Sequence, residues 1–378
     1  MNSWIWPSYW ETASTTDLQN YPHLFWYATL ANVWLAEAPR RFCQQYYASL
    51  VNNAGRARRT GNPSDFGVCM VGTGAIAQKH MATLDELGIR RRPWVVSRRE
   101  EVAKDFAKFW NFDRSASDLD KALGDPEVDV VVITSPSPLH VEQATQALEA
   151  GKDVIVEIPA GLSLASIERL AGRAKEAGRR IFACHTMRSF PAIRMVREKM
   201  LANEFTVTQI DGTFAIPRRR NQGWNGMRSW TDNLLWHHAC HQVDASLWLL
   251  GMPSIQDPIG MLGRPHPETR MYMDLSLGFL CNDGIPVTHT LTYNCEHILW
   301  RIRLVGEEDV LTFQNGELYD DSGVSLLKPF DIRNLSIQNS DIFHALAADK
   351  PSEFDLSSVV PSYAVLQLVD DCLGWSDD

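Results

Sequence analysis

The sequence predicts an α/β protein in which a doubly wound parallel sheet is followed by an α+β domain with an open, mainly antiparallel sheet. Strand-like and helix-like segments alternate between Phe66 and Cys184, which is the pattern of a parallel sheet with crossover helices. A glycine-rich loop joins the first of these strands to the first helix. After about Pro191, strand-like segments follow one another with short connections, as in antiparallel sheets.

Each element of the first part has a local signal. The β-branched run at 128–134 is typical of a central parallel strand, because such strands are buried on both faces. Gly88 and Gly151 each follow a helical segment, where glycine commonly ends a helix. We expect strands at 66–71, 93–96, 128–134, 154–157 and 181–184, and helices at 75–87, 100–110, 119–123, 139–150 and 163–177.

The second part begins with a helix and continues mainly as strands. We expect helices at 192–201, 236–250, 336–347 and 357–373, and strands at 206–216, 271–280, 287–294, 300–305 and 310–313. The predicted domains are a leader at 1–62, a dinucleotide-binding domain at 63–190 and a substrate and dimerisation domain at 191–378. The Trp- and Tyr-rich leader is an appended helix, a targeting piece or a mispredicted start, and its role stays open.

Composition and charge exclude several classes of protein. The chain has 378 residues, with 36 Lys and Arg against 46 Asp and Glu, so binding to a nucleic-acid backbone is not expected. No apolar stretch reaches the roughly 20 residues of a membrane span. The 7 cysteines form no C-x-x-C pair and mostly lie in apolar runs, which is typical of reduced thiols. We therefore expect a cytoplasmic protein whose partner is a small molecule.

The glycine-rich loop reads Gly72-Thr73-Gly74-Ala75-Ile76-Ala77. Gly72 permits a tight turn off the strand, Gly74 lets the backbone approach a pyrophosphate, and Ala77 lets the helix pack closely. The N–H groups at the start of the helix can then bind phosphates. Because a strand precedes the loop and a helix follows it, we expect a Rossmann fold with a bound dinucleotide.

The end of the second strand predicts which dinucleotide binds. NAD usually requires a carboxylate there, but this chain has Ser97, Arg98 and Arg99, and arginines can hold the 2′-phosphate of NADP. The alternative is an ordinary solvated helix start, since Glu100 and Glu101 follow. We expect NADP, with NAD as the second possibility.

Further residues carry a family resemblance. The segments 133–136 with His140, Glu157-Ile158-Pro159, His185 with Phe190-Pro191, and 241–244 resemble the glucose-fructose oxidoreductase/inositol dehydrogenase/MocA (Gfo/Idh/MocA) family over about residues 66–375. Its members join a Rossmann domain to an α+β domain and move hydride between a nicotinamide and a carbon bearing oxygen. The resemblance implies cofactor contacts from Thr134, Ser135, Pro136, His140, Glu157 and Ile158.

One departure from the family pattern bears on catalysis. Members usually have a catalytic Lys where this chain has Ile158, so either catalysis is lost or another group supplies the base. His237, His241 and Asp244 stand at i, i+4 and i+7, which places them on one helix face. An imidazole there can take a hydroxyl proton near neutral pH. We expect His241 or His237 to be the base, with Asp244 orienting it.

Two alternatives remain for this helix. Any one of its histidines can be a buried structural residue, although three in five positions are costly to bury without purpose. His237, His241 and Asp244 can also ligate zinc, but no fourth ligand is evident and the dinucleotide already supplies an oxidant. We therefore expect no metal.

Arginines and aromatic residues gather near the same helix. In an acidic chain, guanidinium groups at Arg188, Arg218-Arg219-Arg220 and Arg228 suggest a carboxylate held bidentately, and a solvated basic loop is the alternative. The segments 157–159, 185–188, 218–219, 229–244 and 263–268 together resemble a branch of the family that oxidises a carboxylated cyclic hemiacetal with NADP. The expected substrate contacts are Arg188, Arg219, Arg228, Trp230 or Trp236, and His238.

The expected function is therefore NADP-dependent oxidation of a hemiacetal or secondary alcohol on a carboxylated ring. A sugar, inositol or dihydrodiol dehydrogenase of the same family is the first alternative. The second is an NADP-binding sensor or corepressor without catalysis, against which the histidine-rich helix argues. An open sheet face in the second domain would favour a homodimer.

Overall fold

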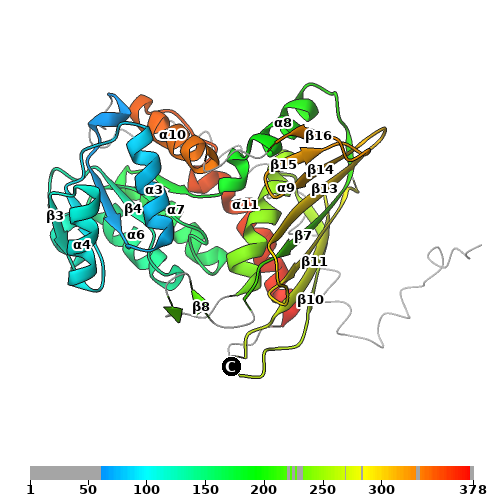
Figure 1. Cartoon of the computed structure of the whole chain (residues 1–378), viewed down its shortest axis with the longest axis horizontal. Coiled ribbons are helices and arrows are strands. Elements are labelled where there is room, and N and C mark those ends of the chain that lie inside the picture. The colour runs from blue at the N-terminus through cyan, green and yellow to red at the C-terminus, as the bar shows by residue number, and fades with distance from the viewer. Residues whose placement is uncertain are drawn as a thin grey trace, which may run out of the picture. The chain divides into compact units, whose positions relative to one another are not determined.

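Two large sheets organise the protein in a computed structural model (Figure 1). The structure describes residues 61–218, 222–223, 226–227, 233–268, 270–281, 284–328 and 333–374. The predicted leader, except for its last two residues, lies outside the described residues, as do Arg219, Arg228 and Trp230.

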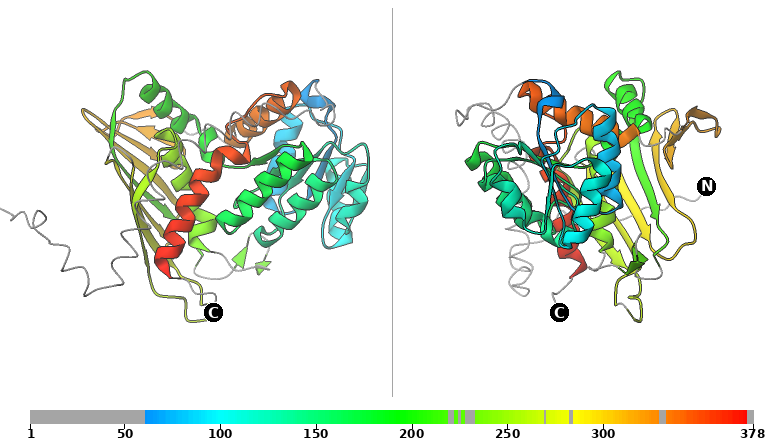
Figure 2. Two further views of the ribbon diagram at one scale, coloured as in Figure 1. Left: turned by 180° about the vertical axis from the view of Figure 1, so that it is seen from behind. Right: turned by 60° about the vertical axis from the view of Figure 1, so that its left-hand side comes forward.

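The N-terminal sheet has six parallel strands in the order β3-β2-β1-β4-β5-β6, which confirms the predicted doubly wound fold. Its central strands β1 (Val68–Val71) and β4 (Val130–Ile133) are buried at every residue, with helices on both faces of the sheet (Figure 2). The strand order reverses between β1 and β4, so the loops after these strands flank the usual ligand crevice. The other strands are β2 (Trp94–Val96), β3 (Arg114–Ala116), β5 (Asp153–Val156) and β6 (Ile181–Ala183).

The helices of this part follow the predicted segments. α4 (Glu100–Trp110) and α5 (Leu119–Leu123) have the predicted bounds. α7 (Leu164–Ala177) begins at Ser163, whose side chain accepts from Ser166 N–H, and ends at Gly178 with φ of 61°. The remaining helices, α3 (Ala75–Glu86) and α6 (His140–Glu149), differ from the prediction by one residue at one or both ends.

The C-terminal sheet has eight strands in the order β10-β11-β12-β7-β13-β14-β15-β16. Only the β7–β12 pair is parallel, which confirms the predicted, mainly antiparallel sheet. Helices α8 (Pro191–Leu201), α9 (Cys240–Leu249) and α11 (Leu356–Leu373) contact its strands. The strands are β7 (Val207–Ala215), β10 (Ile255–Leu262), β11 (Asp274–Cys281), β12 (Pro286–Thr292), β13 (Leu299–Gly306), β14 (Val310–Gln314), β15 (Glu317–Tyr319) and β16 (Ser325–Leu327).

Helix α10 (Arg333–Ala348) returns to the N-terminal sheet and packs against α3 (Figure 1). Its residues Ile342, Phe343 and Leu346 belong to the same hydrophobic cluster as Val68 and Leu84. In the predicted division of the chain this helix falls in the second domain, at 191–378. Its side chains instead complete the core of the first, because α3 would otherwise expose an apolar face.

Several strands lie outside the predicted set. β10 contains Pro258, and its pairing with β11 shifts in register between Gln256 and Ile259. Because of this irregularity, apolar and polar residues do not alternate regularly along the strand. β3, β15 and β16 have three residues each, and β8 (Gln222–Gly223) with β9 (Gly226–Met227) forms a separate pair. Of the helices that the structure describes, none has the length and apolar character needed to cross a bilayer.

Candidate active site

The loop after β1 has the geometry that its glycine pattern predicts. Gly72 has φ of 106°, and a Cβ atom there would lie 2.6 Å from Thr134 Oγ1 and 2.8 Å from the Thr134 backbone. A side chain at Gly72 is therefore excluded on both conformational and steric grounds. Thr134 is itself fixed, because its hydroxyl donates to the Val71 carbonyl oxygen at 2.9 Å.

Space for a phosphate lies beside the next glycine. Apart from its chain neighbours, no described atom lies within 4 Å of the place where Cβ would stand at Gly74, the residue before α3. Ala77 in the first turn is fully buried. The N–H groups of Ala75 and Ile76 lack intrahelical partners, and the positive end of the helix dipole attracts anions. The loop therefore fits the pyrophosphate of a dinucleotide.

The end of β2 carries two exposed guanidinium groups, those of Arg98 and Arg99. Ser97 Oγ lies 3.3 Å from Thr73 Oγ1, which links this end to the glycine loop. The nearby carboxylate of Glu100 pairs with Lys104 at 2.9 Å, and the hydrogen bond between them lowers the pKa of Glu100. Two cationic groups thus stand beside the loop, while Glu100 is neutralised within its own helix.

His140 joins the loops after β4 and β5. Its Nε2 lies 2.7 Å from the Ser135 carbonyl oxygen, and its Nδ1 lies 2.8 Å from the Pro159 carbonyl oxygen. Burial lowers the pKa of His140. Pro136 precedes a short 3₁₀ turn, Ser137–Leu139, that leads into α6. The structure thus brings together most of the predicted cofactor residues of this edge: Thr134, Ser135, Pro136, His140, Glu157 and Ile158.

Glu157 is a partly buried anion at this edge. Burial would raise the pKa of Glu157, but the hydrogen bond from His80 Nε2 at 2.7 Å and the charges of His80 and His140 together outweigh burial and leave that pKa lowered. Ile158 donates its backbone N–H to Glu157 Oε2 at 3.3 Å and has only an apolar side chain. The position that holds Lys in the family therefore offers no base in this chain.

His80, Glu157 and Cys184 form, among the described residues, a group whose potential metal ligands lie within 4.8 Å of one another. The His80–Glu157 contact of 2.7 Å is shorter than the roughly 3.3 Å expected between two ligands on tetrahedral zinc. Burial raises the pKa of the Cys184 thiol, which keeps its proton. These contacts are those of a hydrogen-bonded group, and the predicted absence of a metal stays a prediction.

The residues predicted to carry catalysis lie on one helical stretch. It begins with a π-helical turn, Leu234–Ala239, and continues as α9. Asn233 caps the stretch, because its Oδ1 accepts from the N–H groups of Leu235 at 2.9 Å and Trp236 at 3.1 Å. π-helical turns are rare and occur frequently at functional sites.

The hydrogen bonds of His237 define its tautomer. The Asn233 backbone N–H donates to His237 Nδ1 at 3.2 Å. Because a backbone amide can only donate, Nδ1 carries a lone pair, and the proton of the neutral ring sits on Nε2. Nε2–H then donates to Ser137 Oγ at 2.9 Å. Both ring nitrogens of His237 are thus engaged, and neither can take a substrate proton in this arrangement.

His241 has a different environment. Its ring is half-buried, and its Nδ1 is buried without a hydrogen-bond partner among the described residues. Burial, with a smaller effect from His185, lowers the pKa of His241 to about 4. The ring packs edge-on against Trp300, with 5.2 Å between ring centres. A neutral imidazole with an unoccupied nitrogen can accept a proton at neutral pH.

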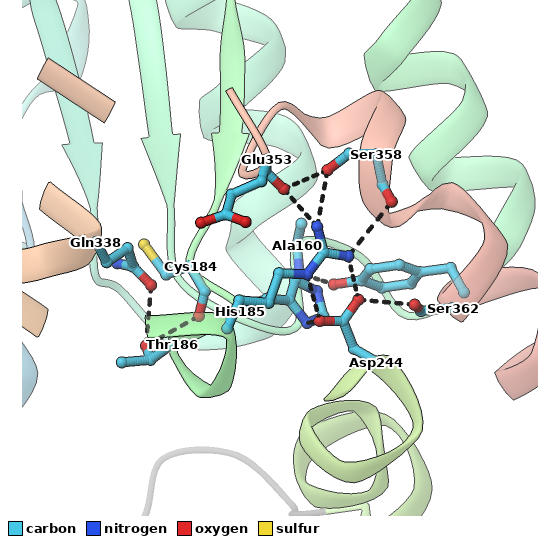
Figure 3. Close-up of polar contacts among 11 residues, drawn as sticks. Ala160, Cys184, His185, Thr186, Asp244, Gln338, Glu353, Ser358 and Ser362 are labelled. Carbon is cyan, nitrogen blue, oxygen red and sulfur yellow. Dashed lines mark hydrogen bonds and ion pairs between the residues drawn. The ribbon is translucent and has the colours of Figure 1, made fainter. Parts of the chain in front are cut away.

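Asp244, labelled beside Ser362 in Figure 3, forms a buried ion pair with Arg188. Arg188 Nε donates to Asp244 Oδ2 at 2.7 Å and Nη2 donates to Oδ1 at 2.6 Å, and each residue is only 1% exposed. Ser362 of α11 adds a hydrogen bond to Oδ1 at 2.7 Å. Burial opposes ionisation of Asp244, but the charges of Arg188 and His185 outweigh it and lower the pKa of Asp244.

These contacts differ from the predicted roles of both residues. Arg188 is predicted to hold a substrate carboxylate, but its guanidinium donates to Asp244, to the Glu353 carbonyl oxygen and to Ser358 Oγ in the protein interior. Asp244 is predicted to orient His237 or His241, but it accepts from Arg188, a stronger bidentate donor. His185 Nδ1, rather than either histidine of the helix, lies 3.3 Å from Asp244 Oδ2. The pair therefore fixes the helix, and the substrate contact expected of Arg188 stays a prediction.

The wall beside His241 is aromatic. Phe214 packs edge-on against Trp300 at 5.1 Å and stacks on His238 at 5.2 Å between ring centres. Tyr293 Oη lies 2.8 Å from His238 Nδ1. The Arg218 guanidinium lies over the Tyr293 ring at 5.6 Å, and burial lowers the pKa of Arg218. His238, a predicted substrate contact, is thus part of this wall.

Phe214, Tyr293 and Trp300 are not among the residues predicted for the site. Phe214 and Trp300 face each other across β7 and β13, and a sequence does not reveal the register of two distant strands. Trp236, a predicted wall residue, is buried and directs its indole N–H toward Asp370 of α11 at 3.4 Å. Trp236 therefore packs toward α11, where its ring stacks on Tyr363, and its place in the wall stays a prediction.

Sequence models of two families match adjacent stretches of the chain. A model described as an oxidoreductase family with an NAD-binding Rossmann fold matches residues 66–185. A second model, described as the C-terminal region of bacterial oxidoreductases, matches residues 191–326. The two matched stretches cover the six-stranded sheet and nearly all of the eight-stranded sheet.

Known proteins extend this similarity. The chain is 30% identical over 313 residues to 4-carboxy-2-hydroxymuconate-6-semialdehyde dehydrogenase of Sphingobium sp. strain SYK-6, which covers 79% of this chain and 96% of that relative. It is 27% identical over 199 residues to scyllo-inositol 2-dehydrogenase (NADP(+)) IolW of Bacillus subtilis strain 168, over 52% of this chain and 54% of that relative. The structure of GenD2 from gentamicin A biosynthesis, in complex with NAD, matches with a TM-score of 0.70 and 22% identity over 84% of this chain and 97% of that chain.

Proposed function

Because the chain belongs to the Gfo/Idh/MocA family of NAD(P)-dependent oxidoreductases, we propose that it oxidises a hemiacetal or secondary alcohol on a carboxylated ring with NADP. One observation carries this proposal: the half-buried imidazole of His241 lies beside an aromatic wall, its pKa is lowered to about 4, and its Nδ1 has no hydrogen-bond partner among the described residues. His237 is engaged at both nitrogens, so we assign the general base to His241.

His241 performs the proton step. The substrate hydroxyl donates to the ring of His241, and the proton moves to that ring as the C–H bond of the same carbon breaks. A bound nicotinamide would supply the hydride acceptor for this oxidation, which gives a ketone from a secondary alcohol and a lactone from a hemiacetal. Because the pKa of His241 is lowered to about 4, the protonated ring then releases its proton readily.

The aromatic wall and its arginine support a flat, acidic substrate. Trp300, Phe214 and His238 offer ring faces and edges, on which a cyclic substrate can pack. Arg218, held over Tyr293, supports recognition of a carboxylate, since guanidinium groups bind carboxylates bidentately. The Sphingobium relative is named for a carboxylated semialdehyde, which supports the same class. We further propose contacts from Arg219, Arg228 and Trp230.

A nicotinamide absorbance screen tests the substrate class. We expect turnover with carboxylated cyclic hemiacetals and hydroxy acids, and turnover at least tenfold lower with neutral polyols. Preference for polyols would instead favour a sugar or inositol dehydrogenase, which the IolW relative supports as the second candidate. Tight cofactor binding without absorbance change on any compound would contradict both and favour a sensor or corepressor.

Cofactor preference is the next expected result. If Arg98 and Arg99 hold the 2′-phosphate, an Arg98→Ala/Arg99→Ala variant should raise the KM for NADP by about 10²–10⁴-fold, because two charged hydrogen bonds are lost and each contributes about 1.5–3 kcal/mol. The KM for NAD should change little, since NAD has no phosphate there. Steady-state kinetics with both cofactors measures the difference.

A matched control for this variant is Arg173→Ala on α7, where an exposed arginine pairs with Glu176. It should leave the KM for both cofactors within twofold. Equal losses for NADP and NAD in the double variant would contradict the assignment of NADP to these arginines.

We also propose a homodimer in the cytoplasm. On β12, Thr288 and Thr290 are exposed while their neighbours are buried, so one face of the sheet is uncovered. The edge strand β10 adds Ile259 at 56% and Met261 at 62% exposure, and exposed apolar surface often marks a subunit contact.

The described cysteines are free thiols, which supports a reducing compartment. Sedimentation of a monomer at micromolar concentration, or recovery in an extracytoplasmic fraction, would contradict these proposals.

A further inference from the structure

The two groups that must meet during hydride transfer lie on different parts of this chain. The loops that fit the cofactor belong to the six-stranded sheet, whereas His241 lies on α9, which contacts the eight-stranded sheet. A displacement of about 1 Å between reacting groups can lower a rate about a hundredfold. The contacts that fix α9 relative to the cofactor loops therefore bear directly on catalysis.

Two such contacts flank His241. His237, four residues before it, hydrogen-bonds Ser137 of the loop after β4. Asp244, three residues after it, pairs with Arg188 in the segment after β6. Both partners come from the part that carries the six-stranded sheet. The residue between the two contacts, His241, keeps a buried nitrogen without a partner among the described residues.

The contact at His237 is directional at each step. The Asn233 N–H donates to His237 Nδ1, and the His237 N–H donates back to the Asn233 carbonyl oxygen at 2.9 Å. His237 Nε2–H then donates to Ser137 Oγ. Ser137 is 5% exposed and His237 is 8% exposed, so water competes little for this bond.

Ser137 also stands next to the loop residues that we expect to contact the cofactor. It follows Pro136 directly, and the Ser135 carbonyl oxygen of the same loop is held by His140. A shift of this loop therefore moves the acceptor of the His237 hydrogen bond. The π-helical turn that carries His237 leads into α9, so the position of His241 depends on the same bond.

We propose that Ser137 is a positioning residue, which ties the base-bearing helix to the cofactor loop through the Nε2–H of His237. The inference rests on the proposed function, because it concerns how His241 is placed for proton removal. Ser137 itself contacts neither the reacting hydroxyl nor its carbon. Its role is to keep the position of His241 fixed relative to the cofactor loop.

Kinetics of Ser137 variants test this role of the hydrogen bond between Ser137 and His237, which we call the tie. Ser137→Ala should lower kcat about tenfold to a hundredfold while the dissociation constant for NADP stays within twofold. Ser137→Thr keeps the hydroxyl and should restore kcat to within about threefold. The double variant Ser137→Ala/His237→Phe should be no slower than the slower single variant, because both changes remove the same bond. Losses that multiply, or a parallel loss of NADP binding, would overturn the tie.

A control in the same turn is Leu139→Ala, since Leu139 is 41% exposed and its side chain makes no such bond. It should keep kcat within twofold. A tenfold loss in this variant would show that any change to the turn slows the reaction, and it would overturn the specific role of Ser137.

A readout without substrate separates this inference from the proposed function. In ¹⁵N-labelled full-length protein, the His237 Nε2–H proton should exchange slowly in the parent chain and in Ser137→Thr, and rapidly in Ser137→Ala. Equal exchange in all three would overturn the tie. If the exchange pattern is as expected but no compound in the substrate screen is turned over, the tie stands and the proposed function fails.

Discussion

A His241→Ala variant should lose about 10²–10⁴-fold in kcat for alcohol oxidation and still bind NADP as the parent chain does. The expected loss follows from the geometry, since His237 is engaged at both nitrogens and Ile158 has no ionisable group. Single-turnover absorbance measurements with saturating NADP would separate the chemical step from cofactor binding.

The pH dependence of the parent chain gives an independent check. His241 acts as a base in its neutral form, and its pKa is lowered to about 4. The value of kcat/KM should therefore stay nearly constant between about pH 5 and 8, whereas a histidine with the usual pKa of about 6.5 would lose activity below that pH. The exposed His344→Ala on α10 is a matched control and should keep full activity. Full turnover in His241→Ala would contradict the assignment.

The second large effect concerns stability. Asp244→Asn should lower the free energy of unfolding by about 3–5 kcal/mol, because it leaves the Arg188 charge buried without its counterion. Arg188→Met should lower the free energy of unfolding by a similar amount, because it leaves the Asp244 carboxylate buried without its counterion. Urea unfolding followed by tryptophan fluorescence measures both, provided that the transition is a single cooperative step.

The double variant Arg188→Met/Asp244→Leu distinguishes a buried ion pair from general damage. Replacing both charges with apolar groups removes the uncompensated charge, so the double variant should be more stable than either single variant. Arg173→Ala, which breaks an exposed pair with Glu176, should change stability by less than about 1 kcal/mol. If the double variant loses the sum of the two single effects, the contacts of Arg188 with Ser358 and Glu353 matter more than the charge pair.

Most of the fold could be predicted because its signals are local. Glycine at 72 marks a turn that only glycine adopts there, and the valine run at 128–134 marks a strand buried on both faces. β10 could not be predicted in this way, because Pro258 and a register shift break its pattern. β3, β15 and β16 have three residues each, and none of them is a continuous apolar run like those of β2 and β6. Their places are set by neighbouring strands and not by their own sequence.

Several residues of the candidate site could be named from the sequence, but the partners of their side chains could not. The histidines of the helix could be named, because their spacing places them near one another. The partner of Asp244 could not, since Arg188 lies 56 residues away in the chain and burial converts a presumed substrate clamp into a structural pair. Phe214 and Trp300 depend on strand register in the same way. The tautomer of His237, which decides between two candidate bases, requires atomic positions.

Helix α10 has a consequence for how this protein is made. Ile342, Phe343 and Leu346 complete the hydrophobic core around β1 and α3, yet they follow every strand of the eight-stranded sheet in the chain. Domains usually fold as units in the order of their synthesis. Here the core around the six-stranded sheet can close only after the eight-stranded sheet has been synthesised. A nascent chain released early would expose the apolar face of α3, which is the kind of surface that chaperones and proteases recognise.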